Sequence, residues 1–292
     1  MSNTGYGLMH EIDVIDLVAR KARPPIDTAP LLGPHGLAFV GGKLWFTAQG
    51  AKALGRYDPA EGRVDWILGT GQDTTHMIHV TPDGSHIFAT NVGSGTVSLF
   101  ANEWVQPTLP PTGVMPHGAK PRLDWVHTLL PVGKGAEGFD VSPDGRELWT
   151  ATPDGALSVV DLRMKTVATS IETGLAGAHR VAFTPDGRHV LIASVATGDL
   201  AILETASREE VKRLRLCRGA GIMVDAMGQR AFVSCTPDDV VSVVDLNTFS
   251  EVRRFSLGGR PDGMAMAVMK QRTWSAPPSP REVNPSLPPL KT

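Results

Sequence analysis

The chain has 292 residues and a formal net charge of −2, and 41% of its residues are apolar. This composition allows a substantial buried core, and the near-neutral charge with only 6% aromatic residues argues against nucleic-acid binding. No apolar run reaches the roughly 18 residues of a membrane span, and no basic segment followed by an apolar one marks an export signal. We therefore expect contact with neither nucleic acid nor membrane. The expected compartment is the cytoplasm, or the periplasm or exterior if an export signal has been removed.

The first predicted strands, near the N-terminus, form only part of a repeating unit. Residues 11–17 (EIDVIDL) and 20–27 (RKARPPID) are typical of a third and a fourth strand, and the residues before them resemble the end of a second. Five complete units follow, from about residue 35 to residue 258. The C-terminus then adds a predicted first strand at 262–268 (DGMAMAV) and a short second one at 271–276 (QRTWSA).

A recurring turn segment defines the unit. HVTPDGSHIFAT, DVSPDGRELWTA and AFTPDGRHVLIA place their turn aspartates at positions 83, 144 and 186. The last two aspartates are 42 residues apart, and SVVDL recurs at Ser158–Leu162 and Ser242–Leu246, at twice that spacing. The first two aspartates are 61 residues apart, because a Pro- and Gly-rich insertion lies at about Asn102–Trp125.

Each unit is predicted to form four short strands, rich in Val, Ile, Thr, Phe and Trp and separated by turns of Pro, Asp and Gly. Four-stranded units of about 40 residues are the signature of a propeller blade, as in WD40-like repeats. A β-sandwich would not repeat at a fixed spacing, and a TIM barrel would need helices between its strands. The sequence therefore predicts an all-β fold, a β-propeller.

Three segments resemble a known repeat. They are FATNVGSGTVSLF (Phe88–Phe100), WTATPDGALSVVD (Trp149–Asp161) and FVSCTPDDVVSVVD (Phe232–Asp245). They are similar to the YVTN repeat of YncE-like proteins and its following strand, and the similarity extends over about residues 12–269. The resemblance implies a propeller. It implies no single activity, because members of this family are functionally diverse, so function has to be argued from a site.

The two termini are expected to complete one blade together. Pairing N-terminal third and fourth strands with a C-terminal first strand would hide two sheet edges that otherwise invite aggregation. We therefore expect six four-stranded blades within residues 1–274. The alternative is a truncated seven-bladed propeller, because YncE-like proteins usually have seven. Residues 275–292 form a Pro-rich tail that cannot pair as strands.

One position in each unit, seven residues before the turn aspartate or its equivalent, gathers polar side chains. We call these residues the polar ring: His35, His76, Glu137, His179, Ala220 and Asp262. In a propeller they would meet at one end of the central channel. The next position in each unit is Gly36, Met77, Gly138, Arg180, Gly221 and Gly263. Glycines there allow close approach of backbone or ligand, and Arg180 could clamp a carboxylate or a phosphate.

The residue types of the ring suggest roles. His35, His76, Glu137 and His179 are candidate ligands of a divalent metal such as Zn, Fe, Mn or Ni. Glu137, His179 and Arg180 are the candidate catalytic residues, because an imidazole and a carboxylate can exchange protons and an arginine can hold an anion. A hydrated channel lined by polar side chains is the alternative interpretation of the same pattern.

Other candidate residues lie beside the ring. Gln49 and Asn91 are in hairpins on the same face and could add hydrogen bonds to a ligand; His35, His76, Arg180 and Asp262 complete the predicted ligand-binding set. Cys217 and Cys235 are expected to be inert buried thiols, and the tryptophans are expected to pack between blades.

Two kinds of function stay open from the sequence. The channel mouth could bind a small, anionic metabolite and act on it as a metal-assisted hydrolase or lyase of a lactone or an ester. Alternatively the chain could be a non-catalytic scaffold that binds a ligand, or a protein partner through the insertion at 102–125.

Overall fold

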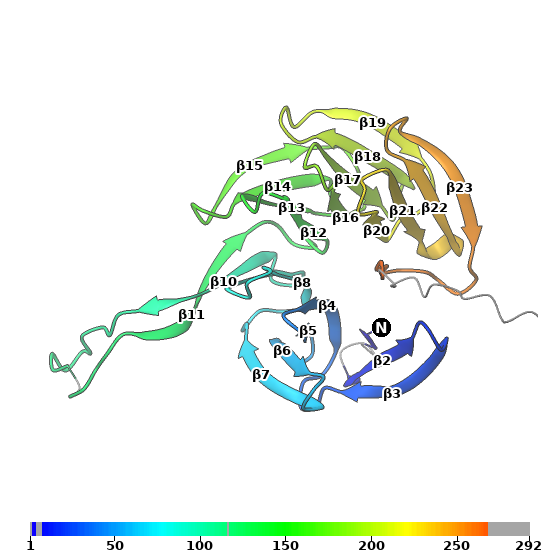
Figure 1. The fold of residues 1–292 in the computed structure, drawn as a ribbon. Coiled ribbons are helices and arrows are strands. Elements are labelled where there is room, and N and C mark those ends of the chain that lie inside the picture. Colours follow the sequence, from blue (N-terminus) through cyan, green and yellow to red (C-terminus); the bar gives the residue numbers. More distant parts are fainter. Residues whose placement is uncertain (1, 4–7, 116, 268–292) are drawn as a thin grey trace, which may run out of the picture.

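The computed structural model describes residues 2–3, 8–115 and 117–267, which fold into six antiparallel sheets. Five of these sheets have four strands each, and their first strands face a common centre while their last strands lie outside (Figure 1). This arrangement confirms the predicted all-β propeller. No helix among the described residues is long and apolar enough to cross a membrane.

Each four-stranded sheet is one continuous stretch of chain. The first two blades comprise β4 (Pro34–Val40), β5 (Lys43–Ala48), β6 (Ala53–Asp58) and β7 (Arg63–Gly69), then β8 (Thr75–Val80), β9 (His86–Asn91), β10 (Thr96–Val105) and β11 (Arg122–Pro131). The third comprises β12 (Phe139–Val141), β13 (Glu147–Ala151), β14 (Ala156–Asp161) and β15 (Thr166–Glu172). The fourth comprises β16 (Ala178–Phe183), β17 (His189–Ser194), β18 (Asp199–Glu204) and β19 (Glu210–Arg215). The fifth comprises β20 (Gly221–Val224), β21 (Arg230–Cys235), β22 (Val240–Asp245) and β23 (Ser250–Ser256), with a 3-10 turn at Thr236–Asp238.

The recurring Pro-Asp-Gly segments form the turns between the first two strands of their blades. In the second blade the hydroxyl of Thr81 donates to the carboxylate of Asp83 at 2.6 Å, and that carboxylate also accepts from the backbone N–H of Ser85. These hydrogen bonds lower the pKa of Asp83 to about 2. Gly84 follows with a φ of +69°, a conformation that glycine adopts without strain. The turn is therefore held by its own side chains.

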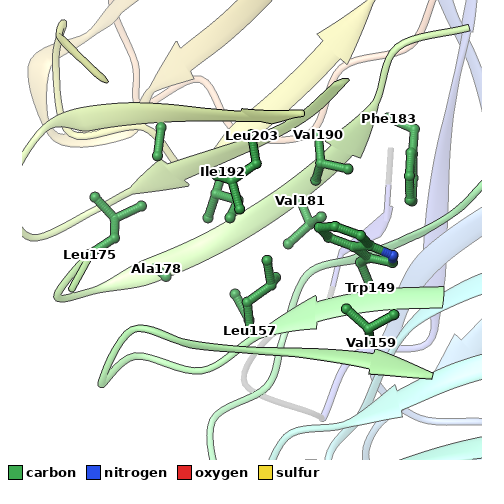
Figure 2. Packing of buried hydrophobic residues seen from close by; sticks show 12 residues of the cluster. Trp149, Leu157, Val159, Leu175, Ala178, Val181, Phe183, Val190, Ile192 and Leu203 are labelled. Atoms are coloured by element: carbon green, nitrogen blue, oxygen red, sulfur yellow. The ribbon is translucent and has the colours of Figure 1, made fainter. Parts of the chain in front are cut away.

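Neighbouring blades are joined by apolar side chains that interdigitate between their sheets. Figure 2 shows this packing between the third and fourth blades, where Trp149 of β13 faces Phe183 and Val181 of β16. The rings of Trp149 and Phe183 meet edge to face with centroids 5.7 Å apart, and Trp149 is 0% exposed. Trp45 of the first blade is also buried, so these two tryptophans pack as predicted.

The sixth sheet has three strands and comes from the N-terminus. It pairs β1 (Ser2–Asn3) with β2 (Glu11–Asp16) and β2 with β3 (Lys21–Asp27). The last two match the predicted third and fourth strands. Residues 262–267, the described part of the predicted closing strand, are not in a strand. The segment at 271–276 and the Pro-rich tail lie outside the described residues, so the observed ring has five complete blades and one partial one.

The insertion forms the end of a long hairpin. β10 and β11 are ten residues long, and the part that pairs Asn102 with Trp125 and Val105 with Arg122 extends beyond the neighbouring strand β9. The hairpin projects from the ring (Figure 1). Both ends of the insertion continue the strands that flank it.

Cys217 and Cys235 form a disulfide in the fifth blade. The expectation of two separate thiols was wrong. The two residues are in adjacent parts of one blade, because Cys217 precedes β20 and Cys235 ends β21, so the antiparallel pairing of these strands brings their Cα atoms to 5.6 Å.

Candidate functional site

The polar ring occupies equivalent places in successive blades. A hydroxyl on the second strand of one blade donates to the carbonyl oxygen of the ring residue in the next: Thr47 to His76 at 2.6 Å and Thr90 to Glu137 at 2.7 Å. Ser234 donates in the same way to the carbonyl of Asp262. The repeated contact explains why residues tens of positions apart share one level of the channel.

The glycines that follow the ring residues allow this close approach. A Cβ on Gly138 would lie 2.4 Å from the carbonyl oxygen of His179, and a Cβ on Gly36 would lie 2.6 Å from that of His76. Neither separation is possible for a real side chain. Gly36 and Gly138 thus allow the backbones of neighbouring blades to approach closely. Approach of the backbone was one of the two interpretations of these glycines, and approach of a ligand was the other.

A continuous row of hydrogen bonds links three ring residues. Nε2 of His76 is 2.7 Å from one carboxylate oxygen of Glu137, and Nε2 of His179 is 3.0 Å from the other. The amide of Gln49 bonds Nδ1 of His76 and extends the row. Four predicted site residues, which span 130 positions of sequence from Gln49 to His179, therefore form one polar assembly.

His179 has a polar partner at each ring nitrogen. Its Nδ1 lies 3.2 Å from the carbonyl oxygen of Ala220, and its Nε2 lies 3.0 Å from the Glu137 carboxylate. The ring therefore links the carboxylate of the third blade to the backbone of the fifth.

Glu137 is ionised although it is largely enclosed. Burial alone would raise the pKa of its carboxyl group, but the hydrogen bonds and the positive charges of His179 and His76 outweigh burial and hold the pKa far below its usual range. The carboxylate is therefore an acceptor at every physiological pH.

His35 stacks on the His76 ring, with centroids 3.7 Å apart and an interplanar angle of 28°. Burial, the neighbouring His76 and the charge of Arg180 lower the pKa of His35 to about 3, so its ring is neutral at physiological pH. Its Nδ1 is buried and has no hydrogen-bond partner among the described residues. His35 therefore brings an unused hydrogen-bonding atom to the ring.

Arg180 is the buried cation of the site. It is 8% exposed, and its Nε donates to the carbonyl oxygen of Ala220 at 3.0 Å. Its Nη2 lies 3.7 Å from the carboxylate of Asp262, whose side chain is 55% exposed, a separation too long for a hydrogen bond. Nη1 is buried without a partner among the described residues. The guanidinium is only partly satisfied by the protein.

Asn91 is not part of this assembly. It is 0% exposed, and its amide bonds Thr75, Thr96 and Ser98 inside the second blade. The sequence placed Asn91 near the ring because it lies at the hairpin after the first two strands. Asn91 is the last residue of β9, whereas Gln49 is the first residue after β5, so the two side chains occupy different places in their blades.

No group of three or more His, Cys, Asp or Glu side chains within residues 2–3, 8–115 and 117–267 is positioned to hold an ion. The Nε2 atoms of His76 and His179 instead face the two carboxylate oxygens of Glu137.

Comparison with known proteins identifies a fold and no family. No family model matches the chain, and no curated protein matches its sequence. Among solved structures it is similar to a chain of hydrazine synthase from Kuenenia stuttgartiensis, with a TM-score of 0.69 and 15% identity over 87% of this chain and 82% of that one. At this identity the similarity establishes the β-propeller scaffold alone.

Proposed function

We propose that this propeller binds a small anionic molecule, a carboxylate or a phosphate, at the channel mouth, with Arg180 as its anchor. The observation that carries the proposal is the incomplete pairing of a buried guanidinium. Its Nη1 has no partner among the described residues, and the carboxylate nearest to Nη2 is 3.7 Å away. Leaving a buried charged donor unpaired costs free energy, which an anion would recover.

Asp262 supports this proposal by its position. Its side chain is 55% exposed and lies beside the guanidinium without a close hydrogen bond. A ligand carboxylate could replace it and bind two guanidinium nitrogens at once, the geometry that arginine favours. His35, with its free Nδ1 and neutral ring, would add a directional hydrogen bond.

Catalysis is the second candidate function, favoured by the contact between His179 and Glu137. The imidazole beside the anchored ligand could transfer a proton to a leaving group, and Glu137 would stabilise the charged form of the ring. This would suit the hydrolysis or elimination of a lactone- or ester-like metabolite. A metal-assisted version of either reaction would need His35, His76, Glu137 and His179 to turn toward a common point, and elemental analysis of the purified protein tests it.

We also propose how the ring closes and which family the chain belongs to. We propose six blades, because the carbonyl of Asp262 accepts from Ser234 as the ring residues of complete blades accept from Thr47 and Thr90. Asp262 would then mark the inner side of the blade to which β1, β2 and β3 belong. From the repeat segments alone, we propose that the chain is related to the YVTN-repeat, YncE-like proteins.

A ligand screen tests the anionic site. Citrate, malate, acetate and inorganic phosphate would be titrated by calorimetry into the full chain and into Arg180→Gln and Arg218→Gln. Arg218 is the matched control, because it pairs with Asp238 on an exposed surface. We expect saturable binding of at least one anion, weakened at least about tenfold by Arg180→Gln and unchanged by Arg218→Gln. Equal affinity in all three proteins would refute the proposal.

A further inference from the structure

A cavity lies away from the channel mouth, between the first and second blades. It measures about 420 Å³ and is lined by three tryptophans, namely Trp45 and Trp66 of the first blade and Trp125 of the second. Cavities of this size, with aromatic walls and a few polar groups, are typical of small-molecule sites. We call it the tryptophan cleft.

The long hairpin builds one wall of the tryptophan cleft. Trp125 on β11 and Asn102 on β10 are register partners, and both line the cavity. Both residues bound the insertion that distinguishes the second blade from its repeats. The cleft therefore depends on a feature that the repeating blade does not supply.

The three indoles form angled walls. The Trp45 and Trp66 rings have centroids 5.3 Å apart and planes at 68°, and the Trp66 and Trp125 rings have centroids 5.6 Å apart and planes at 58°. The rings are therefore not parallel, and no two of them form a slot for a flat ligand. Faces that point in more than one direction can pack against the C–H groups of a puckered ring.

The cations that line the tryptophan cleft are paired by the protein itself, and the carboxylate of Asp83 at its edge is held by Thr81 and Ser85. Arg56 donates two hydrogen bonds to Asp65, at 2.8 and 3.2 Å, and Lys43 pairs with Asp58 and Asp65. The guanidinium carbon of Arg56 already lies 5.0 Å from the Trp45 ring centre, so a second cation would be repelled there. An anion gains little, because these cations are neutralised. The occupant should be uncharged.

Polar atoms at the cleft suit hydroxyl groups. The side-chain amide of Asn102 and the indole N–H groups of Trp66 and Trp125 make no side-chain hydrogen bond to the described part of the chain, and Asp83 adds a carboxylate at the edge. The amide and the carboxylate supply acceptors, and the amide and the indoles supply donors. A hydroxyl group can donate to these acceptors and accept from these donors.

We propose that the tryptophan cleft binds a neutral sugar, with a pyranose ring against the half-buried indoles of Trp66 and Trp125 and its hydroxyl groups on Asn102 and Asp83. The proposal does not depend on the anion site in the channel. Sugar rings present apolar C–H faces and polar edges, which matches angled tryptophans with hydrogen-bonding groups around them.

The test follows the indole N–H resonances of the ¹⁵N-labelled full chain while cellobiose, maltose, lactose or chitobiose is added. We expect at least one disaccharide to shift the Trp66 and Trp125 signals saturably, with a Kd in the millimolar range or below. Trp125→Ala should weaken binding at least about tenfold. Trp104→Ala is the matched control, because Trp104 is on the same hairpin but 70% exposed and outside the cavity.

Two further variants keep the test decisive. Asn102→Ala leaves the tryptophans intact and should weaken binding several-fold. The proposal can therefore still be tested if Trp125→Ala does not fold. Arg180→Gln should leave sugar binding unchanged, so this proposal and the anion site fail independently. The proposal is overturned if none of the four sugars moves these resonances at about 10 mM, or if benzyltrimethylammonium or phosphate moves them and the sugars do not.

Discussion

His179 donates to the carboxylate of Glu137 across a blade boundary, with Nε2 and Oε2 3.0 Å apart, although 42 positions of sequence separate the two residues. The separation equals the spacing of the PDG repeat. Residues that are one repeat apart in sequence therefore come into contact, because each repeat begins its inner strand at the same level of the channel.

The first prediction concerns the contacts of Glu137 with two histidines. Glu137→Gln should disturb His76 and His179 together, because one carboxylate faces the Nε2 atoms of both rings. Long-range ¹⁵N–¹H correlation spectra should show the ring signals of both residues shifted in the variant. Ring signals of His76 and His179 that stay in place would contradict the arrangement.

The second prediction concerns Asp140, which links the third and fourth blades by accepting a hydrogen bond from the backbone N–H of Phe183 at 2.8 Å. Burial raises the pKa of its carboxyl group to about 6, against an ordinary value of 3.8. A raised pKa means that the folded state holds the proton more tightly than the unfolded state. The stabilisation is therefore complete below about pH 4 and lost as the pH rises through about 6.

We expect the free energy of unfolding to fall by about 1–3 kcal/mol between pH 4 and pH 7 as Asp140 ionises, since one pKa unit corresponds to about 1.4 kcal/mol. The lower end of that range applies if solvent reaches the carboxyl group. Urea unfolding at several pH values measures the decline. Asp140→Asn loses one acceptor at all pH values, but its stability should fall less steeply over the same interval. Parallel curves for the two proteins would argue against the shift.

The third prediction concerns the packing between blades. Trp149→Ala should lower the free energy of unfolding by about 3–5 kcal/mol, because it leaves a cavity against Phe183 and Leu157. Thermal unfolding followed by circular dichroism measures the loss. Trp104→Ala removes the same side chain from the exposed hairpin, where it is 70% exposed, and should change stability by less than about 0.5 kcal/mol.

The fourth prediction concerns the N-terminal sheet. Deleting Met1–Arg20 removes β2, whose Ile12 is 2% exposed and packs with Leu31 and Phe46 of the first blade. We expect the melting temperature to fall by at least about 10 °C, the equivalent of several kcal/mol for a domain of this size. Deleting residues 276–292 should leave it unchanged. A chain that melts normally without its first 20 residues would refute the proposed closure.

The repeat spacing was enough to predict the blades and to align His35, His76, Glu137 and His179 at one level. It could not predict which side chains would touch. Asn91 and Gln49 were both assigned to hairpins on the channel face, but Asn91 is the last residue of β9 and Gln49 the first after β5. Asn91 is enclosed by hydroxyl groups of its own blade, while Gln49 reaches His76. A shift of one position in a strand changes the side of the sheet that a side chain faces, and the repeat spacing does not fix strand ends to one residue.

The disulfide and the hairpin show a second limit. Cys217 and Cys235 are 18 residues apart with a full turn and a strand between them, so only the register of β20 against β21 reveals their proximity. The Pro- and Gly-rich composition of the insertion indicated a loop. The pairing of Asn102–Val105 with Arg122–Trp125 shows that strand pairing begun inside the blade can extend into such a segment.

The hydrogen bonds from Thr47 to the carbonyl of His76 and from Thr90 to the carbonyl of Glu137 use the backbone of the ring residues and do not depend on their side chains. At these two positions the blades are held together whichever side chain the ring residue carries. Substitutions of His76 and Glu137 can therefore change the chemistry of the channel mouth while this contact between the blades is kept.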